Sequence, residues 1–228
     1  LACPLRWFLT TIGADGPSNA AASLGTLVHA VAEEHPHGTP EEMTAALEAR
    51  IEELGYNLDT WAGRVADRHA RDIVNNLAAY VVGVPGDVTV EQTVSAEVEG
   101  VTIRGRMDRL EQVDEGVRVT DLKTGKGGYT KASVTENPQL AAYQMALLAS
   151  GEKVAGARIA LLGGSKPQIF DQPALEGEEL ERWREWVREV ALSARGPYFE
   201  ARPSAEACRY CSFDRLCPAR ERGRKVVE

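Results

Sequence analysis

The hydrophobic period of the chain changes abruptly near residues 83–86, and this change constrains the fold more than any other feature. In residues 60–82, apolar or aromatic side chains repeat every four positions, as on one face of a helix: Val65, His69, Ile73, Leu77 and Val81. Three later runs are rich in Val, Thr and Ile and are separated by short Gly-containing turns: residues 88–97, 101–111 and 116–122. The pattern therefore predicts a long helix followed by an antiparallel three-stranded meander.

The rest of the chain is predominantly helical in pattern. Thr39, Pro40 and Glu42 form a helix-start signal, with a capping Thr, Pro at the first helical position and Glu three residues after the cap. Other helices are expected at residues 1–10, 20–34, 138–150 and 176–195, and a further strand at 156–163. A helical first third, a central sheet and a helix–strand–helix ending predict a mixed α/β fold, with residues 1–228 forming a single domain.

Composition excludes several classes of protein. The chain has 228 residues, of which 43% are hydrophobic and 26% charged, the balance of an ordinary globular protein. No apolar run approaches the roughly 18 residues of a membrane span, and the first residues do not resemble a signal peptide, so we expect a cytoplasmic protein with no membrane partner. The net charge of −8 argues against a uniformly basic nucleic-acid binder. The chain opens without Met on a helix-like run, which predicts a piece of a longer polypeptide.

Carboxylates and a lysine converge in the predicted meander. Asp121 and Lys123 are two residues apart at the end of one strand, so they share a face, and a hairpin can bring Asp108 alongside them. Carboxylate oxygens bind Mg²⁺ or Mn²⁺, which polarises a phosphate and lowers the pKa of a bound water, while a lysine neutralises developing charge. The Asp-x-Lys motif taken alone is very common and more often belongs to an exposed hairpin with surface ion pairs.

The helix after this hairpin adds two polar residues on one face. Gln139 and Tyr143 are four residues apart, and a Gly-rich loop precedes the helix. The succession GRMDR, DLKTGK and QLAAY resembles the RecB-like nucleases of the PD-(D/E)xK superfamily. The resemblance implies a restriction-endonuclease-like core, in which helices flank a central mixed sheet.

The resemblance also implies roles for individual residues. The helix before the sheet carries LGTLVH, which matches a family pattern GxxxH and indicates His29 as a metal ligand, although a histidine on an apolar helix more often packs in a core. The implied ligands of Mg²⁺ or Mn²⁺ are His29, Asp108, Asp121 and the backbone carbonyl of Leu122. The implied catalytic set is Asp108, Asp121, Lys123, Gln139 and Tyr143.

The four cysteines form a further pattern. Cys3 lies at the start, and Cys208, Cys211 and Cys217 form C-x₂-C-x₅-C near the end. Four thiolates suit either structural Zn²⁺ or an iron–sulfur cluster. The sequence is similar to a branch of these nucleases with one cysteine before the fold and three after it, which implies a structural [4Fe–4S] cluster joining residues 1–10 to 203–228.

These resemblances predict a metal-dependent DNA nuclease, most like the C-terminal nuclease domain of AdnAB/AddB-type recombination helicase–nucleases. Its expected substrate is single-stranded DNA unwound by a helicase motor of the same chain, beside a partner helicase–nuclease subunit, during double-strand-break processing and recombinational repair. A free-standing CRISPR-adaptation-type nuclease, a catalytically silent module that binds DNA ends or a partner, and a zinc scaffold remain alternatives. Basic residues near the proposed site could contact phosphates or could be solvated surface charges: Arg104, Arg106, Lys126 and Lys131.

Overall fold

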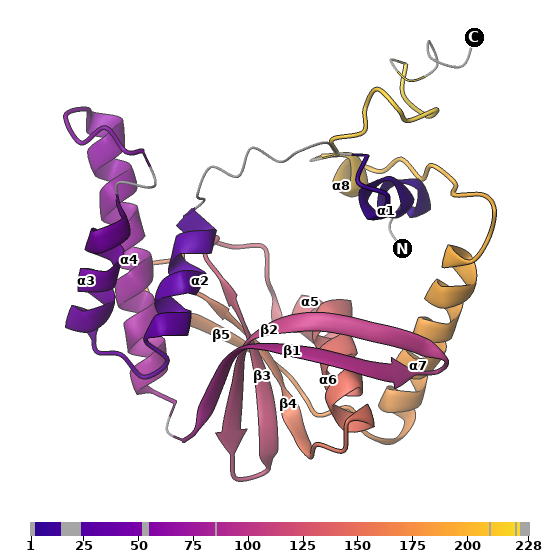
Figure 1. The fold of residues 1–228 in the computed structure, drawn as a ribbon, viewed down its shortest axis with the longest axis horizontal. Helices are drawn as coiled ribbons and strands as arrows, with labels where there is room; N and C mark the ends of the chain where they lie inside the picture. Colours follow the sequence, from indigo (N-terminus) through magenta and orange to yellow (C-terminus); the bar gives the residue numbers. More distant parts are fainter. Residues whose placement is uncertain are drawn as a thin grey trace. The chain divides into compact units, whose positions relative to one another are not determined.

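A five-stranded mixed sheet with strand order β1-β2-β3-β4-β5 lies at the centre of the fold (Figure 1). The computed structural model describes residues 3–14, 24–51, 55–84, 86–209, 211–221 and 223. The strands are β1 (Val88–Val98), β2 (Val101–Val113), β3 (Gly116–Lys123), β4 (Val154–Leu161) and β5 (Gln168–Gln172). Neighbouring strands pair antiparallel except β3 and β4, which are parallel. The predicted antiparallel meander of β1, β2 and β3 is confirmed.

Helices cover both faces of this sheet. On one face lie α2 (Leu24–Glu34), α3 (Pro40–Arg50) and α4 (Trp61–Val82). These helices share a buried apolar core with Leu122 of β3, Ala160 of β4 and Leu162, which follows β4. On the other face lie α5 (Lys131–Thr135) and α6 (Pro138–Ala149), which pack on apolar residues of β1 to β4. The expected restriction-endonuclease-like arrangement, a central mixed sheet flanked by helices, is thereby confirmed; the cluster-stapled termini remain a prediction.

Local sequence signals explain most element boundaries. Thr39 and Glu42 form the predicted capping box at the start of α3, each side chain bonding the other residue's backbone N–H. In α4, Ile73, Leu77 and Val81 are buried as the helical repeat predicts, but Val65 is 42% exposed because the first turns of the helix extend beyond the core. The helix predicted over 20–34 is described from Leu24 onward, and residues 20–23 lie outside the described residues.

The sheet is irregular where β1 and β2 pass the site. Pairing runs from Val88 opposite Glu111 to Val98 opposite Val101 and is interrupted only at Glu91 and Asp108. Met107 packs in the α6-side core, whereas Glu111, four residues on, bonds Tyr80 of α4 on the opposite face. The alternation of side chains between the two faces therefore shifts between Met107 and Glu111, next to the unpaired position Asp108.

The described residues group into two compact units, residues 20–184 and residues 1–19 with 185–228. The boundary falls within α7 (Gly177–Ala194). In the second unit, α1 (Pro4–Thr11) packs beside the segment before α8 (Ala205–Cys208): Leu5 N–H donates to the Glu200 carbonyl, and Phe8 stacks on Phe199 with ring centroids 4.3 Å apart. The single-domain organisation of residues 1–228 stays a prediction. No helix in the described ranges combines the length and apolar character that a membrane span requires.

Candidate active site

The C-terminal end of β3 presents the Asp-x-Lys pair. Asp121 and Lys123 lie on one face, with Lys123 Nζ 2.7 Å from Asp121 Oδ2, while Leu122 between them is buried in the core under α4. The Lys123 ammonium thus pairs closely with a buried carboxylate oxygen. The parallel pairing of β3 with β4 requires the crossover through α5 and α6, which brings α6 beside this strand end.

Asp108 links the sheet to α2. Its Oδ2 accepts the Leu122 backbone N–H at 2.7 Å, which fixes the carboxylate against β3. Its Oδ1 lies 3.3 Å from Nδ1 of His29 on α2. His29 therefore contacts Asp108, which is bonded to the residue after Asp121, so the three predicted ligands lie near one another, as the sequence motifs indicate.

Helix α6 supplies the remaining two motif residues. Asn137 caps the helix through the N–H groups of Gln139 and Leu140, so the first turn is fixed beside β3. Gln139 Nε2 donates to Asp121 Oδ1 at 3.1 Å and lies 3.2 Å from the Tyr143 hydroxyl. That hydroxyl in turn donates to the Arg106 backbone carbonyl at 2.8 Å, which connects α6 to β2.

Burial and paired charges shift the titration of these groups. Burial raises the pKa of Asp121, and the charge of Lys123 offsets part of the shift. For Lys123 burial acts to lower the pKa, but the negative charge of Asp121 outweighs it and the pKa is raised. The contact with Asp108 raises the pKa of His29. Clustered titratable groups whose pKa values are shifted by burial and by specific charge partners are typical of catalytic and metal sites.

A third carboxylate, that of Glu91, joins the site from β1. His29, Glu91 and Asp108 each offer one ligand atom within 4.8 Å of the others' ligand atoms, which is a spacing that a metal ion can bridge. Burial raises the pKa of Glu91, and the neighbouring Asp108 charge acts in the same direction. The sequence motifs did not identify this residue. The turn at residues 99–100 could have indicated Glu91 from the sequence, because a two-residue hairpin loop there places position 91 opposite Asp108.

An open hollow of about 440 Å³ adjoins the carboxylates on the α2 side. Its lining includes Gly25 and His29 of the GxxxH pattern, together with Glu33, Glu91 and Arg106. Gly25 and His29 thus share the wall that faces β1 and β2. The hollow gives solvent and small ions access to His29 and Glu91.

The four residues predicted to contact phosphates differ in their exposure and partners. Arg104 on β2, Lys126 after β3 and Lys131 at the start of α5 are exposed. The Arg106 guanidinium instead pairs with Glu91 and lies 3.7 Å from Glu33. Their contact with DNA stays a prediction.

The cysteines lie in the second unit. Cys3, Cys208, Cys211 and Cys217 are partly buried free thiols. Within the described ranges, no cysteine belongs to a group of three or more ligand atoms within 4.8 Å of one another. Residues 1–2, 210, 222 and 224–228 of the predicted cluster-binding ends lie outside the described residues.

Comparison with known proteins defines the class of the protein. A sheet edge carrying Asp108 and Asp-x-Lys, flanked by helices on both faces, is the architecture of a nuclease fold, and the model of the PD-(D/E)XK nuclease superfamily matches residues 1–218. The chain belongs to this superfamily.

The chain is also similar to solved structures. A candidate exonuclease from Eubacterium rectale is similar, with a TM-score of 0.56 and 16% identity over 91% of this chain and 80% of that chain. A structure named SSO0001 matches with a TM-score of 0.42 and 16% identity over 95% of this chain and 94% of its own. No curated protein sequence matches the chain.

Proposed function

We propose that this chain is a metal-dependent deoxyribonuclease that hydrolyses phosphodiester bonds at the end of β3. The carrying observation is that Asp121 lies between Lys123 and Gln139 while Asp108, held by the Leu122 N–H, faces His29. Superfamily membership supports the reaction class, and this arrangement supports assigning the reaction to these residues.

The residues present fit a divalent cation. The ligand atoms of His29 and Asp108 face one another at 3.3 Å, and Asp121 adds a buried carboxylate beside them. His29, Asp108, Asp121 and the Leu122 carbonyl would hold Mg²⁺ or Mn²⁺, hard cations that prefer oxygen ligands. When bound, the cation polarises the phosphate and lowers the pKa of a coordinated water.

Side chains of the site neutralise charge on the phosphate, position Asp121 and contact the DNA. Lys123 stays protonated because Asp121 raises its pKa, so its ammonium neutralises charge that develops on the phosphate. Gln139 holds Asp121 Oδ1, while Lys123 pairs with Oδ2 of the same carboxylate. Tyr143 anchors Gln139 to β2 through the Arg106 carbonyl. Arg104, Lys126 and Lys131 track the phosphates of the DNA strand.

Cleavage of end-labelled single- and double-stranded DNA with Mg²⁺ or Mn²⁺ tests the proposal. Asp121→Asn and Lys123→Ala are each expected to lower the cleavage rate at least about 100-fold, because each removes a charge at the reacting phosphate. Asp114→Asn and Lys153→Ala, which change exposed residues of the same types, serve as controls. Equal cleavage by all four variants would refute the site. DNA retention without any cleavage by the unaltered chain would instead favour the silent binding module.

The biological setting proposed for this activity rests on the sequence resemblance. The chain acts on single-stranded DNA delivered by a helicase motor, with a partner helicase–nuclease subunit, in double-strand-break processing and recombinational repair of the AdnAB/AddB type. A preference for single-stranded over duplex substrate in the same assay supports this setting.

We further propose that Cys3, Cys208, Cys211 and Cys217 bind a structural [4Fe–4S] cluster. Arg6 of α1 donates to the Ala207 carbonyl at 3.0 Å, so the helix that begins after Cys3 lies beside the residue that precedes Cys208. Cys211 N–H bonds the Cys208 carbonyl, which gives these two cysteines a tight turn. The cluster would tie the two ends of the chain together.

A further inference from the structure

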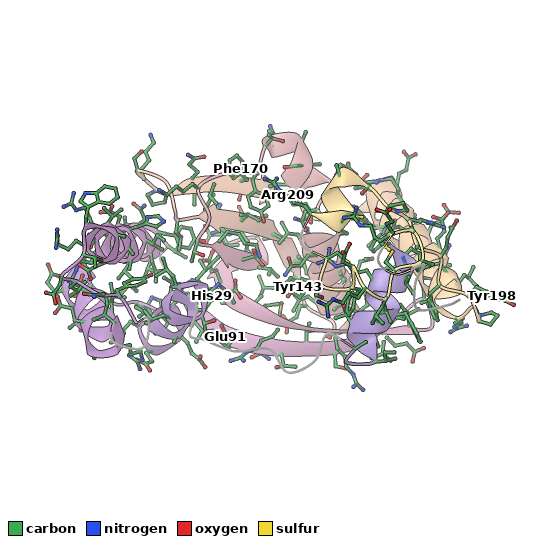
Figure 2. The ribbon with its side chains drawn as sticks, turned by 90° about the horizontal axis from the view of Figure 1, so that it is seen from above. His29, Glu91, Tyr143, Phe170, Tyr198 and Arg209 are labelled. Carbon is green, nitrogen blue, oxygen red and sulfur yellow. The ribbon has the colours of Figure 1, made fainter. Side chains whose placement is uncertain are left out.

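Glu91 is a carboxylate of the site that the sequence motifs leave unexplained. It lies on β1, at the register position opposite Asp108, and its Oε1 is 3.9 Å from Nδ1 of His29. Figure 2 shows the two side chains next to each other, His29 on α2 and Glu91 on the sheet edge. Glu91 therefore contacts the same histidine as Asp108 does, from the adjacent strand.

The two carboxylate oxygens of Glu91 have different surroundings. Oε2 pairs with Nε of Arg106 on β2. Oε1 faces His29 Nδ1 and belongs to the group of ligand atoms that also includes Asp108. With one oxygen held by the guanidinium, the other is oriented toward the site, and the side chain is only 14% exposed.

The backbone at this position is also unusual. Glu91 has φ of +51°, a left-handed conformation that non-glycine residues seldom adopt, and it interrupts the β1–β2 ladder. In a regular extended strand, the side chain at this position would point to the face of the sheet opposite to that of the residues before and after it. Such conformations persist where the surrounding structure over-determines them, often at functional sites.

The charges around Glu91 favour a bound cation. Glu91 and Asp108 place two carboxylates against one imidazole, and Asp121 adds negative charge from β3. Arg106 neutralises one oxygen of Glu91 but also faces Glu33, so it does not neutralise the whole group. A divalent cation between His29, Glu91 and Asp108 would relieve the repulsion between the carboxylates.

We propose that Glu91 is an additional protein ligand of the divalent cation, contributed by β1 next to the ligands from α2, β2 and β3. The assignment rests on the proposed metal-dependent function. It makes the cation a link between both strands of the β1–β2 hairpin and the helix that carries His29.

Binding of Mn²⁺ to the metal-free protein, measured by isothermal titration calorimetry in the absence of DNA, tests this assignment. Glu91→Gln keeps the size of the side chain and is expected to weaken Mn²⁺ binding at least about tenfold. Glu33→Gln is the matched control: it removes the same charge from the same hollow and from the same Arg106, but Glu33 is outside the ligand group. Its Mn²⁺ affinity is expected to stay within about twofold of the unaltered chain's.

A second substitution separates ligand loss from misfolding. Glu91→Gly removes the carboxylate but suits a positive φ, so the fold is retained and the Mn²⁺ affinity should fall as in Glu91→Gln. Unaltered affinity in both Glu91 variants would overturn the assignment, and so would an equal loss in Glu33→Gln. Asp108→Asn distinguishes the two proposals: if it also leaves Mn²⁺ binding intact, the proposed metal site fails. If it abolishes binding while Glu91→Gln does not, only the Glu91 assignment fails.

Discussion

Gly105 shows how one missing side chain positions the catalytic candidates. A Cβ at this position on β2 would lie 2.4 Å from Cε1 of Tyr143, so Gly105→Ala must displace the ring. The ring is only partly buried and can move, so we expect a stability loss of about 1 kcal/mol. The displaced hydroxyl loses its contacts with Gln139 and the Arg106 carbonyl, and cleavage should fall at least about tenfold. Denaturant unfolding and DNA cleavage measure the two effects.

Gly125→Ala is the control for this substitution. Gly125 follows Lys123 closely in the chain, and a Cβ there meets nothing within 4 Å, so both stability and cleavage should be retained. An active Gly105→Ala variant would show that the position of the Tyr143 ring does not matter for catalysis.

The left-handed backbone at Glu91 gives a prediction about stability that is independent of metal. Ala is strained at positive φ by about 1–2 kcal/mol, whereas Gly is not, but Gly has about 0.5–1 kcal/mol more unfolded-state entropy to lose. In metal-free protein, Glu91→Gly should therefore unfold with a free energy about 0.5–1 kcal/mol higher than Glu91→Ala. Urea denaturation of both variants with chelator present measures this difference, and the opposite order would argue against a strained backbone here.

At the scale of elements, predictability from the sequence follows the strength of local signals. The capped helix α3, the long helix α4 and the Val- and Thr-rich strands β1 to β3 carry a clear period or start signal, and all were predicted. The five-residue helix α5 and the five-residue strand β5 are too short to show a period and were missed.

The site shows the same limit on prediction. The resemblance to a nuclease family predicts the site residues, and the structure brings them together: His29, Asp108, Asp121, Lys123, Gln139 and Tyr143. Glu91 was missed because its contribution depends on the strand register and on an irregular backbone, neither of which is a property of local composition. The buried Arg109–Glu111 pair was missed for a similar reason, since a charged residue in a strand predicts exposure until a partner such as Tyr80 is known.

Gln172 explains how the weak strand β5 is held in place. Its Nε2 lies 2.8–3.2 Å from three backbone carbonyls at the end of α5, and its Oε1 accepts from Gln144 of α6. Gln172→Ala leaves these buried groups unpaired and should lower the free energy of unfolding by about 3 kcal/mol. Gln168→Ala, at an exposed position of the same strand, should change it by less than about 0.5 kcal/mol. Thermal or urea unfolding of the pair measures the contrast, and equal effects would refute the anchoring role.

At the scale of the whole chain, the proposed cluster connects residues that are distant in sequence. The α1 helix and the segment around Phe199 and Ala207 already contact each other in the second unit, while residues 20–184 form the other compact unit between them in the sequence. A link between Cys3 and Cys208 would thus enclose the whole nuclease core in one closed loop. Closing so long a loop restricts the unfolded chain strongly.

Cys208→Ala tests whether such a link stabilises the protein. By loop-closure entropy, closing a loop of roughly 200 residues contributes about 5 kcal/mol, so the variant should lose most of its folding stability together with its bound iron. Ala205→Ser, at the exposed start of α8, is the control and should keep both. Iron and sulfide content, visible absorbance and thermal unfolding report on the two variants. A stable, active, iron-free Cys208→Ala protein would contradict the structural cluster, whereas stoichiometric zinc in the unaltered chain would replace it with a zinc site on the same thiolates.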